Sequence, residues 1–501
     1  MNTDGLIIDY QPDAVQGLLD ALKQNGAAVD GSDMGVGKTA HAVAVIRELK
    51  LPTLALVPAV AISGWKWMGD HLKTEFEIES HEMVRLGRSP YGWWDNPPPK
   101  RLPTFFKCTQ CQCVVDPAKP FPCPHHHTGI HCVKTYKKEH NYGKFNWHPA
   151  VKLLVIDEIH RFGGLDSLNA DMLISAKTRG LPVLGLSATL GDSPLGFRGI
   201  GFCLGLHSLV DTNSTPGFYR WAAKHGVRRV PMMGLQWMVG EDKKLGIMNK
   251  LHDEIFPSRG VRVRIKDLGD KFPDCKITAE LIDLDKGGQI EKLYKQMERP
   301  LEAMHDRRNS DVSGPLSDFL RLHQEIGLLK CPVMAEIAQE GVKAGHHVAL
   351  FVNYRAELEA LCELLDTQCR IDGSQTGPGG QARRQRNIED FCEDREEYII
   401  ATIPAGGIAI SLKDCYGNFP RLGLSFLNPS ARMMRQVFGR LPRQGGKSKS
   451  LYRVLCAAGT REVKNHRALT MKLNNLDALN DGDCCPENLP LTSFEECGKL
   501  F

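Results

Sequence analysis

A glycine-containing stretch near the start of the chain has the residue types that bind phosphate groups. Residues 32–39 read SDMGVGKT, and Gly35 and Gly37 allow the backbone to turn its N–H groups inward. The Lys38 ammonium group can reach the β- and γ-phosphates of a nucleotide, and the Thr39 hydroxyl can bind Mg²⁺. The first position is serine, where a strict phosphate-binding motif has glycine. Because a helical pattern follows directly, the stretch predicts a nucleotide at a helix N-terminus.

A second stretch places two adjacent carboxylates directly after an apolar run. Residues 153–160 read LLVIDEIH, and ligands of open α/β sheets lie at the carboxyl ends of the strands. Asp157 could hold Mg²⁺ opposite Thr39, and Glu158 could orient and activate the attacking water. The alternative is an acidic turn exposed to solvent. A phosphate loop in the same part of the chain favours the catalytic interpretation.

Short apolar runs alternate with helical patterns on both sides of a more polar, helical middle. The runs are 53–58, 151–156, 181–186, 347–352, 398–403, 422–427 and 451–455. This alternation predicts an α/β fold with two parallel-sheet lobes in tandem. The predicted divisions are lobe one at 1–270, containing a Cys/His-rich insertion at 104–148 and a helical region at 205–258, a linker and helical region at 271–330, lobe two at 331–470, and a C-terminal tail at 471–501.

The bulk composition sets limits but does not choose a function. A chain of 501 residues is too long for one ordinary core. A formal net charge of +4 permits nucleic-acid binding without requiring it. We find no pattern of a secretory leader and no apolar stretch of membrane-spanning length, so we expect a cytoplasmic protein. Its 16 cysteines are then expected as free thiols or metal ligands.

The order of these motifs resembles the SWI/SNF-type branch of superfamily 2 helicases, in the compact form found in phages and other viruses. The resemblance spans most of the chain. Residues 32–39 resemble the family's Asp-Glu-Met-Gly-Leu-Gly-Lys-Thr, 157–160 match its Asp-Glu-x-His box, and 187–189 match its Ser-Ala-Thr motif. The segment 56–67 (LVPAVAISGWKW) resembles the motif that lies along the nucleic-acid backbone.

The resemblance implies two RecA-like lobes, ATP and Mg²⁺ as cofactors, and a role for each matching residue. Gln11 is expected to contact adenine, whereas the residues of the phosphate loop and Asp157 are expected to bind the phosphates and Mg²⁺. The residues expected to couple hydrolysis to movement are His160, Ser187, Thr189, Gly406, Gly407 and Gln436. In the stretch 401–412 (ATIPAGGIAISL), alanine occupies a position where glycine is usual.

An arginine motif completes the predicted ATP site from the second lobe. Residues 436–445 read QVFGRLPRQG and resemble the family's arginine-finger motif. A guanidinium group is always charged and can stabilise the negative charge that develops on the γ-phosphate oxygens. Arg440 and Arg443 are the candidates, and we favour Arg443 as the finger. Because the two arginines belong to the other lobe, hydrolysis would require the lobes to close.

The insertion in lobe one contains a cluster of possible zinc ligands. Paired thiolates followed by a later Cys/His group are typical of a closed structural Zn²⁺ site. The preferred ligands are Cys108, Cys111, Cys123 and Cys132, with Cys113, His125, His127 and His131 as possible substitutes. The alternative is a loop with free cysteines.

The sequence thus predicts an ATP-dependent DNA translocase or helicase that acts in replication, repair or recombination. DNA and proteins of replication or recombination are the expected partners, with no membrane contact, in the bacterial host cytoplasm for a phage protein. The first alternative is an RNA helicase, because the motifs do not distinguish the two sugars. The second is a clamp that binds nucleic acid without hydrolysing ATP.

Overall fold

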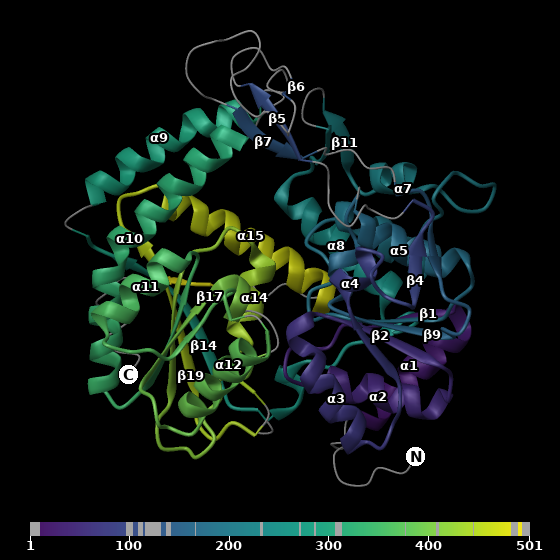
Figure 1. The fold of residues 1–501 in the computed structure, drawn as a ribbon, viewed down its shortest axis with the longest axis horizontal. Coiled ribbons are helices and arrows are strands. Elements are labelled where there is room, and N and C mark those ends of the chain that lie inside the picture. Colours follow the sequence, from purple (N-terminus) through teal and green to yellow (C-terminus); the bar gives the residue numbers. More distant parts are fainter. Residues whose placement is uncertain are drawn as a thin grey trace.

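The protein consists of two lobes, each built on one parallel sheet, and they lie side by side in the computed structural model (Figure 1). The two lobes confirm the predicted α/β fold. The structure describes residues 11–96, 104–108, 114–115, 132–136, 142–165, 167–230, 234–269, 272–284, 287–305, 313–375, 377–406, 410–443, 445–481 and 489–492.

Lobe one contains a parallel sheet of six strands in the order β13-β1-β10-β9-β2-β3. The strands are β1 (Ala27–Asp30), β2 (Thr53–Val57), β3 (Glu77–Ser80), β9 (Leu153–Asp157), β10 (Val183–Leu186) and β13 (Gly260–Val261). The helices are α1 (Gln11–Asn25), α2 (Lys38–Leu49), α3 (Ile62–His71), α4 (His81–Arg85), α5 (Leu168–Thr178), α6 (Arg198–Leu204), α7 (Phe218–Lys224) and α8 (Glu241–Ile255). Short 3-10 turns are η1 (Ala59–Ala61), η2 (Ile159–Phe162), η3 (Pro194–Phe197) and η4 (Ile265–Asp267).

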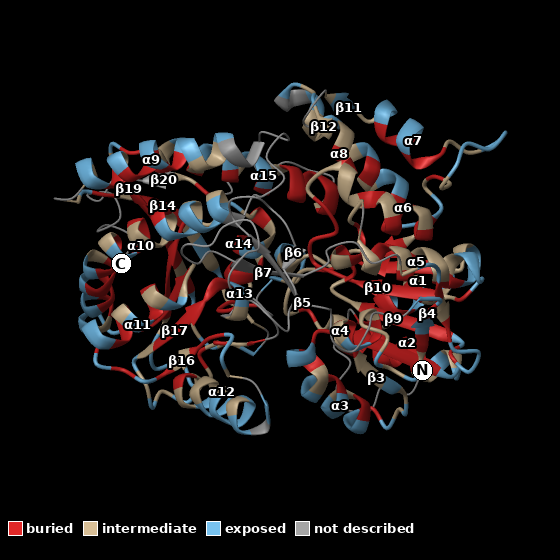
Figure 2. Ribbon diagram, turned by 45° about the horizontal axis from the view of Figure 1, so that its top comes forward, coloured by how far each residue is buried: buried red, intermediate tan, exposed pale blue. Residues whose placement is uncertain are grey.

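Alternate residues of each strand in this sheet enter two different cores. In β9, Leu153 and Val155 pack with helices α1, α2 and α3, whereas Leu154 and Ile156 pack with α5, α6 and α8. Successive side chains of a strand point to opposite faces, so an unbroken apolar run is expected where both faces are covered. Figure 2 shows the resulting buried strands between their helices. The carboxyl ends of β1, β10 and β9 are therefore held on a rigid edge.

Lobe two contains a parallel sheet of seven strands in the order β16-β17-β15-β18-β19-β14-β20. The strands are β14 (Cys275–Ile282), β15 (His347–Val352), β16 (Arg370–Ile371), β17 (Tyr398–Thr402), β18 (Arg421–Phe426), β19 (Ser450–Ala457) and β20 (Leu491–Thr492). The helices are α9 (Gly287–His305), α10 (Ser313–Lys343), α11 (Arg355–Leu364), α12 (Gly377–Cys392), α13 (Ile403–Gly406), α14 (Ala431–Phe438) and α15 (Glu462–Asp481). Helices α14 and α15 share one core of this sheet, and α10 and α11 share the other.

The described part of the chain also contains three small antiparallel sheets outside the two main sheets. Strands β4 (Gly92–Trp94) and β8 (Phe145–Trp147) pair with each other, as do β11 (Val227–Val230) and β12 (Gly234–Trp237). Strands β5 (Thr104–Cys108), β6 (Val114–Val115) and β7 (Cys132–Tyr136) form the third sheet, within the predicted Cys/His-rich insertion. The region 205–258 thus contains a β-hairpin in addition to helices.

Two elements do not follow the predicted domain divisions. Strand β14 lies within the stretch 271–330 and is a member of the second sheet, where it pairs with β19 along its whole length. Helix α15 extends beyond residue 470, at which lobe two was predicted to end. Both elements were missed because their partners are distant in the sequence. In the described part of the chain, no helix combines the length and apolarity needed to cross a membrane.

The contact between α10 and α11 buries an acidic side chain. Glu357 is 0% exposed, and its Oε2 accepts hydrogen bonds from the backbone N–H groups of Asn353 at 2.8 Å and Tyr354 at 3.1 Å. Burial raises the pKa of Glu357 to about 7, and the nearby Lys330 ammonium group opposes this shift. Its other oxygen, Oε1, has no hydrogen-bond partner among the described residues. The carboxylate form of Glu357 is therefore unfavourable in the folded state.

Replacing Glu357 with glutamine should flatten the pH dependence of stability. The pKa in the fold is about 7, whereas the ordinary value is 4.5, so the stabilising contribution is complete below pH 4.5 and is lost as pH rises through 7. Between pH 5 and 8 the free energy of unfolding of the wild type should fall by about 3 kcal/mol relative to Glu357→Gln. Urea unfolding at several pH values measures this difference. The exposed Glu359 provides the control, since Glu359→Gln should show the wild-type slope.

Candidate active site

The phosphate loop connects β1 to α2 at the carboxyl edge of the first sheet. Gly35 and Gly37 have φ angles of 88° and 99°, a region that residues with a Cβ rarely adopt. At the start of the loop, the fully buried Asp30 pairs through Oδ2 with His41 Nδ1 at 2.7 Å. The same carboxylate accepts a hydrogen bond from the Ser32 N–H at 3.0 Å. The shape of the loop is thus fixed from the strand before it and the helix after it.

Lys38 lies at the first position of α2 and contacts the first half of the loop. Its Nζ donates hydrogen bonds to the carbonyl oxygens of Ser32 and Asp33, both at 2.8 Å. Burial lowers the pKa of Lys38, and the negative charges of Asp30 and Glu158 oppose this effect. An ammonium group that is held by two carbonyl oxygens can exchange them for phosphate oxygens when a nucleotide binds. Thr39 follows it in the first turn of α2.

The acidic pair lies where β9 ends. Asp157 is the last residue of the strand, and Trp65 Nε1 donates a hydrogen bond to its Oδ2 at 3.0 Å. Burial and the adjacent charge of Glu158 raise the pKa of Asp157 to about 6. A buried carboxylate with a raised pKa fits a cation site, and Asp157 with Thr39 would hold Mg²⁺. When bound, Mg²⁺ neutralises charge on the phosphate oxygens.

Glu158 has a strained backbone and a specific hydrogen-bond network. Its φ and ψ angles are 54° and 49°, in the left-handed region that non-glycine residues adopt at a cost. Glu158 Oε2 lies 3.2 Å from His160 Nδ1, which lies 2.9 Å from Ser187 Oγ. Burial raises the pKa of Glu158, but His160, Lys38 and Arg440 outweigh it and lower the value to about 2. Glu158 is therefore ionised at neutral pH.

Ser187 extends this network along the neighbouring strand. Its Oγ donates to Thr189 O at 3.1 Å and accepts from the N–H of the same residue at 3.1 Å. Strand β10 lies between β1 and β9, so the segment after it separates the phosphate loop from the acidic pair. The structure thus brings His160, Ser187 and Thr189 together beside Glu158. Burial lowers the pKa of His160, which favours the neutral imidazole.

Two arginines of lobe two reach the phosphate loop of lobe one. They follow α14, and Arg440 donates from Nε to Gln436 O at 2.8 Å and from Nη1 to Ile410 O at 3.0 Å. Arg443 Nη2 donates to the same Ile410 carbonyl at 3.2 Å. A Cβ added to Gly35 would lie 2.9 Å from Arg443 Cδ. The arginine side chain therefore packs directly on the loop.

The two guanidinium groups create a site for an anion. Burial lowers the pKa of Arg440 to about 10, and burial together with the charge of Arg440 lowers that of Arg443 to about 9. Both remain protonated at neutral pH. Arg443 Nε is buried and has no hydrogen-bond partner among the described residues. A phosphate group placed between Arg443 and Lys38 would supply the missing acceptor and compensate the buried charge.

Several other predicted residues take positions beside the loop or outside the described residues. Gln11 begins α1, and its Nε2 donates to Val36 O at 3.2 Å, so the side chain lies against the phosphate loop. Gln436 is buried in α14. Gly406 ends α13, whereas Gly407 lies outside the described residues.

The predicted zinc ligands fall largely outside the described residues. Cys111 and Cys123 are not described, and neither are the four substitutes. Cys108 and Cys132 are register partners in the antiparallel pair β5 and β7. Among the described side chains, no group of three or more His, Cys, Asp or Glu residues could hold a metal. The zinc site stays a prediction.

Sequence reasoning missed three residues that contact this site or face it. Trp65 holds Asp157, although the segment that contains it was assigned to nucleic-acid binding. Arg432 of α14 is half-buried, and burial lowers its pKa, an effect that the negative charges of Asp192 and Glu158 partly offset. Arg262 pairs with Asp33 of the loop. The signal for Arg432 was available, because it lies eight positions before Arg440 in the stretch that contains the arginine motif. Arg262 belongs to a basic cluster in the sequence, but nothing local indicated its pairing with Asp33.

No family model matches the chain. Over 491 residues the chain is 29% identical to a putative ATP-dependent RNA helicase of Acanthamoeba polyphaga mimivirus, a match that covers 96% of this chain and 85% of that protein. Among solved structures it is similar to S. cerevisiae Dbp5 bound to RNA and ADP BeF3, with a TM-score of 0.47 and 11% sequence identity over 98% of this chain and 91% of that chain.

The mimivirus relative corrects the prediction of DNA as the nucleic acid. It is named as an RNA helicase, so the prediction of a DNA translocase with replication or recombination partners is wrong. The error has a physical reason. The motifs bind the nucleotide and the phosphate backbone, which DNA and RNA share, whereas a protein distinguishes the two through contacts to the 2′-hydroxyl. The comparison also gives no support to the SWI/SNF-type assignment or to a phage origin.

Proposed function

We propose that this chain, a superfamily 2 helicase by its two lobes and the order of its motifs, is an ATP-dependent RNA helicase. The main support for the proposed ATPase activity is the contact between Arg443 of lobe two and Gly35 of the phosphate loop. It places a charged guanidinium, with a buried N–H that lacks a partner among the described residues, beside the loop that contains Lys38. Such an arrangement is suited to a γ-phosphate bound between two lobes.

The chemistry follows from the position of each side chain. Lys38 moves from the carbonyls of Ser32 and Asp33 to the β- and γ-phosphates. The ionised Glu158 orients a water molecule, whose oxygen attacks the γ-phosphorus while the bond to the β–γ bridging oxygen breaks and ADP leaves with the electron pair. The water proton passes to solvent or phosphate. Arg443 stabilises the charge on the γ-phosphate oxygens.

The hydrogen-bond network beyond Glu158 supports coupling of this step to movement. His160 contacts both Glu158 and Ser187, so a change at the γ-phosphate can be transmitted to the segment after β10. Because Arg440 and Arg443 come from the other lobe, the complete site exists only when the lobes are in contact. Hydrolysis and phosphate release would therefore open and close the surface that binds RNA.

The RNA part of the proposal is supported by the name of the mimivirus relative. A strand-separation assay tests it. We expect the full chain to release a labelled strand from an RNA duplex with a single-stranded tail when ATP is present, and not with a non-hydrolysable analogue. ATP-dependent release from a DNA duplex but not from the RNA duplex would contradict the proposal.

Zinc binding in the Cys/His-rich insertion is a separate prediction. Purified protein should contain about one equivalent of zinc, because four Cys or His ligands saturate one tetrahedral ion. Elemental analysis measures it. A content below about half an equivalent would contradict the prediction, and the variant Cys203→Ser, which changes a buried cysteine in lobe one, should retain the metal.

A further inference from the structure

Helix α15 begins in lobe two and ends in lobe one (Figure 1). Leu473 and Leu476 belong to the core of lobe two, whereas Ala478 and Leu479 belong to the core of lobe one that includes α8. Every residue from 475 to 480 is buried, although a surface helix normally exposes one polar face. The last turns of α15 are therefore enclosed between the two lobes.

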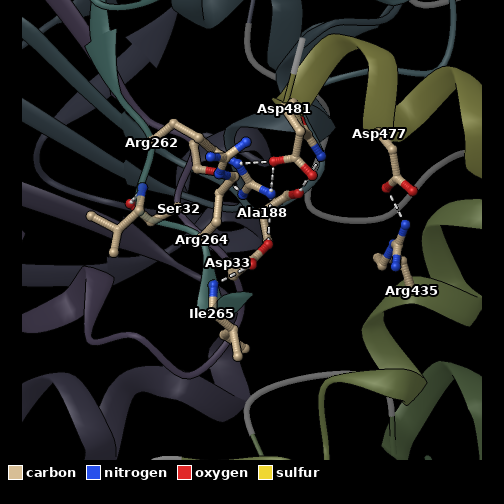
Figure 3. Close-up of polar contacts among 12 residues, drawn as sticks. Ser32, Asp33, Ala188, Arg262, Arg264, Ile265, Arg435, Asp477 and Asp481 are labelled. Carbon is tan, nitrogen blue, oxygen red and sulfur yellow. Dashed lines mark hydrogen bonds and ion pairs between the residues drawn. The ribbon is translucent and has the colours of Figure 1, made fainter. Parts of the chain in front are cut away.

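Arg262, which follows β13, lies between the end of α15 and the phosphate loop (Figure 3). Its Nη2 is 2.6 Å from Asp33 Oδ1 and 2.7 Å from Asp481 Oδ1. Its Nε also donates to Asp481 Oδ1, at 2.8 Å, and its Nη1 donates to Gly31 O. Only 8% of the Arg262 side chain is exposed. One buried guanidinium thus joins a carboxylate on the last residue of α15 to the loop that carries Lys38.

Asp33 connects this guanidinium to the catalytic lysine. Its Oδ2 accepts a hydrogen bond from the Ile265 N–H at 2.8 Å, and its own N–H donates to Val263 O at 2.9 Å. These bonds fix both the side chain and the backbone of Asp33. The Asp33 carbonyl is one of the two acceptors on which Lys38 Nζ rests. The position of Lys38 therefore depends on how firmly Arg262 and its neighbours hold Asp33.

Two further residues at the end of α15 contact other parts of the site. Asn480 Nδ2 donates to Ala188 O at 2.8 Å, between Ser187 and Thr189. Asp477 pairs with Arg435 of α14, the helix that precedes the two arginines of lobe two. Residues three and four positions apart share one face of a helix. Asp477, Asn480 and Asp481 thus reach α14, the segment after β10 and the phosphate loop from one helical turn.

Loss of the Asp481 carboxylate would release Arg262 from α15 but would leave the contacts of the loop within lobe one in place. Asp33 would keep Arg262 as a partner, because that contact lies within lobe one. The loop would keep its backbone hydrogen bonds to 263–265. Arg262 would no longer be held from α15, and the loop would open more often. Nucleotide binding by lobe one should survive, whereas the alignment of Lys38 with the arginines of lobe two should not.

From this arrangement we infer that the last turn of α15 aligns the two halves of the ATP site, with Arg262 and Asp481 as positioning residues that act on Lys38 through Asp33. The inference rests on the proposed ATPase function for its effect on rate. Its effect on the phosphate loop is independent of that function.

The rate test compares Asp481→Asn with wild type in the full chain, in the presence of RNA. Removing this link should lower kcat about tenfold, within the range of coupling between sites, and change the dissociation constant for ADP by less than about twofold. Asp481→Glu should restore most of the rate because it keeps the charge. The control Asp171→Asn breaks an ion pair with Arg198 within lobe one and should leave kcat unchanged.

The second readout is hydrogen–deuterium exchange of the backbone N–H groups of residues 31–37, without ATP turnover. Asp481→Asn should speed their exchange about tenfold, whereas Asp171→Asn should not. Unchanged exchange or an unchanged kcat in Asp481→Asn would overturn the inference. An equal decrease in kcat in Asp171→Asn would also overturn it. If wild type hydrolyses no ATP, the proposed function fails, and faster exchange in Asp481→Asn alone would still support the positioning role.

Discussion

Lys38→Ala is expected to lower the rate of ATP hydrolysis at least about a thousandfold. The Lys38 ammonium group is held over the loop by two carbonyl oxygens, close to the acidic residues after β9. Alanine removes the charge that would bind the β- and γ-phosphates and leaves the carbonyls of Ser32 and Asp33 without this donor. Phosphate release measured in the presence of RNA gives the rate.

Lys152→Ala is the matched control for this substitution. Lys152 is an exposed lysine at the amino end of β9, on the opposite edge of the sheet from the site. Its replacement should leave the hydrolysis rate within about twofold of wild type, as expected for a surface change. Undiminished turnover in Lys38→Ala would contradict the assignment of the phosphate loop as the ATP site.

Arg443→Ala should abolish turnover while leaving nucleotide binding nearly intact. The loss in kcat should be about a thousandfold, the effect of removing a guanidinium that stabilises the transition state for phosphoryl transfer. The dissociation constant for ADP should change little, because the residues that bind it lie mainly in lobe one. Arg440→Ala should also lower the rate, with a loss of stability, because Arg440 holds the carbonyls of Gln436 and Ile410.

The exposed Arg355 provides the control for the lobe-two substitution. It pairs with Glu359 on the surface of α11, at 2.7 Å, and Arg355→Ala should keep wild-type kcat. If Arg443→Ala weakened ADP binding as much as it lowered kcat, the residue would be structural. A normal hydrolysis rate in Arg443→Ala together with a large decrease in rate in Arg440→Ala would indicate that Arg440 is the arginine finger.

The sequence could predict the sheets and the strand ends because those features are local. An apolar run such as 153–156 with Asp157 and Glu158 directly after it specifies both a buried strand and the chemistry at its end. The phosphate loop is local in the same way, since Gly35 and Gly37 lie where the backbone has positive φ angles. Motifs of this kind can be interpreted without knowing which distant segments they contact.

The residues that support the site could not be predicted, because their partners are far away in the sequence. Arg262 lies 229 positions from Asp33, and Asn480 lies 292 positions from Ala188. Strand β14 was assigned to a linker because its place in the second sheet depends on pairing with β19. Local patterns contain no information about which distant segment fills a gap between two lobes.

The identity of the nucleic acid was predicted wrongly for a related reason. The motifs that determined the prediction bind ATP or track phosphates, and neither contact depends on the sugar. The resemblance to the family was therefore too weak to choose DNA over RNA. The relative with 29% identity over most of this chain supplied the correction.

The rate of ATP hydrolysis with different nucleic acids tests the central claim most directly. Wild-type protein and Lys38→Ala are each assayed alone and with saturating single-stranded RNA, single-stranded DNA or duplex DNA, with a reaction without protein as the background. We predict a rate at least about tenfold higher with RNA than without nucleic acid, a smaller increase with either DNA, and no rate above background in Lys38→Ala. Tight RNA binding without hydrolysis would indicate a clamp, and a larger increase with DNA than with RNA would contradict the proposed function.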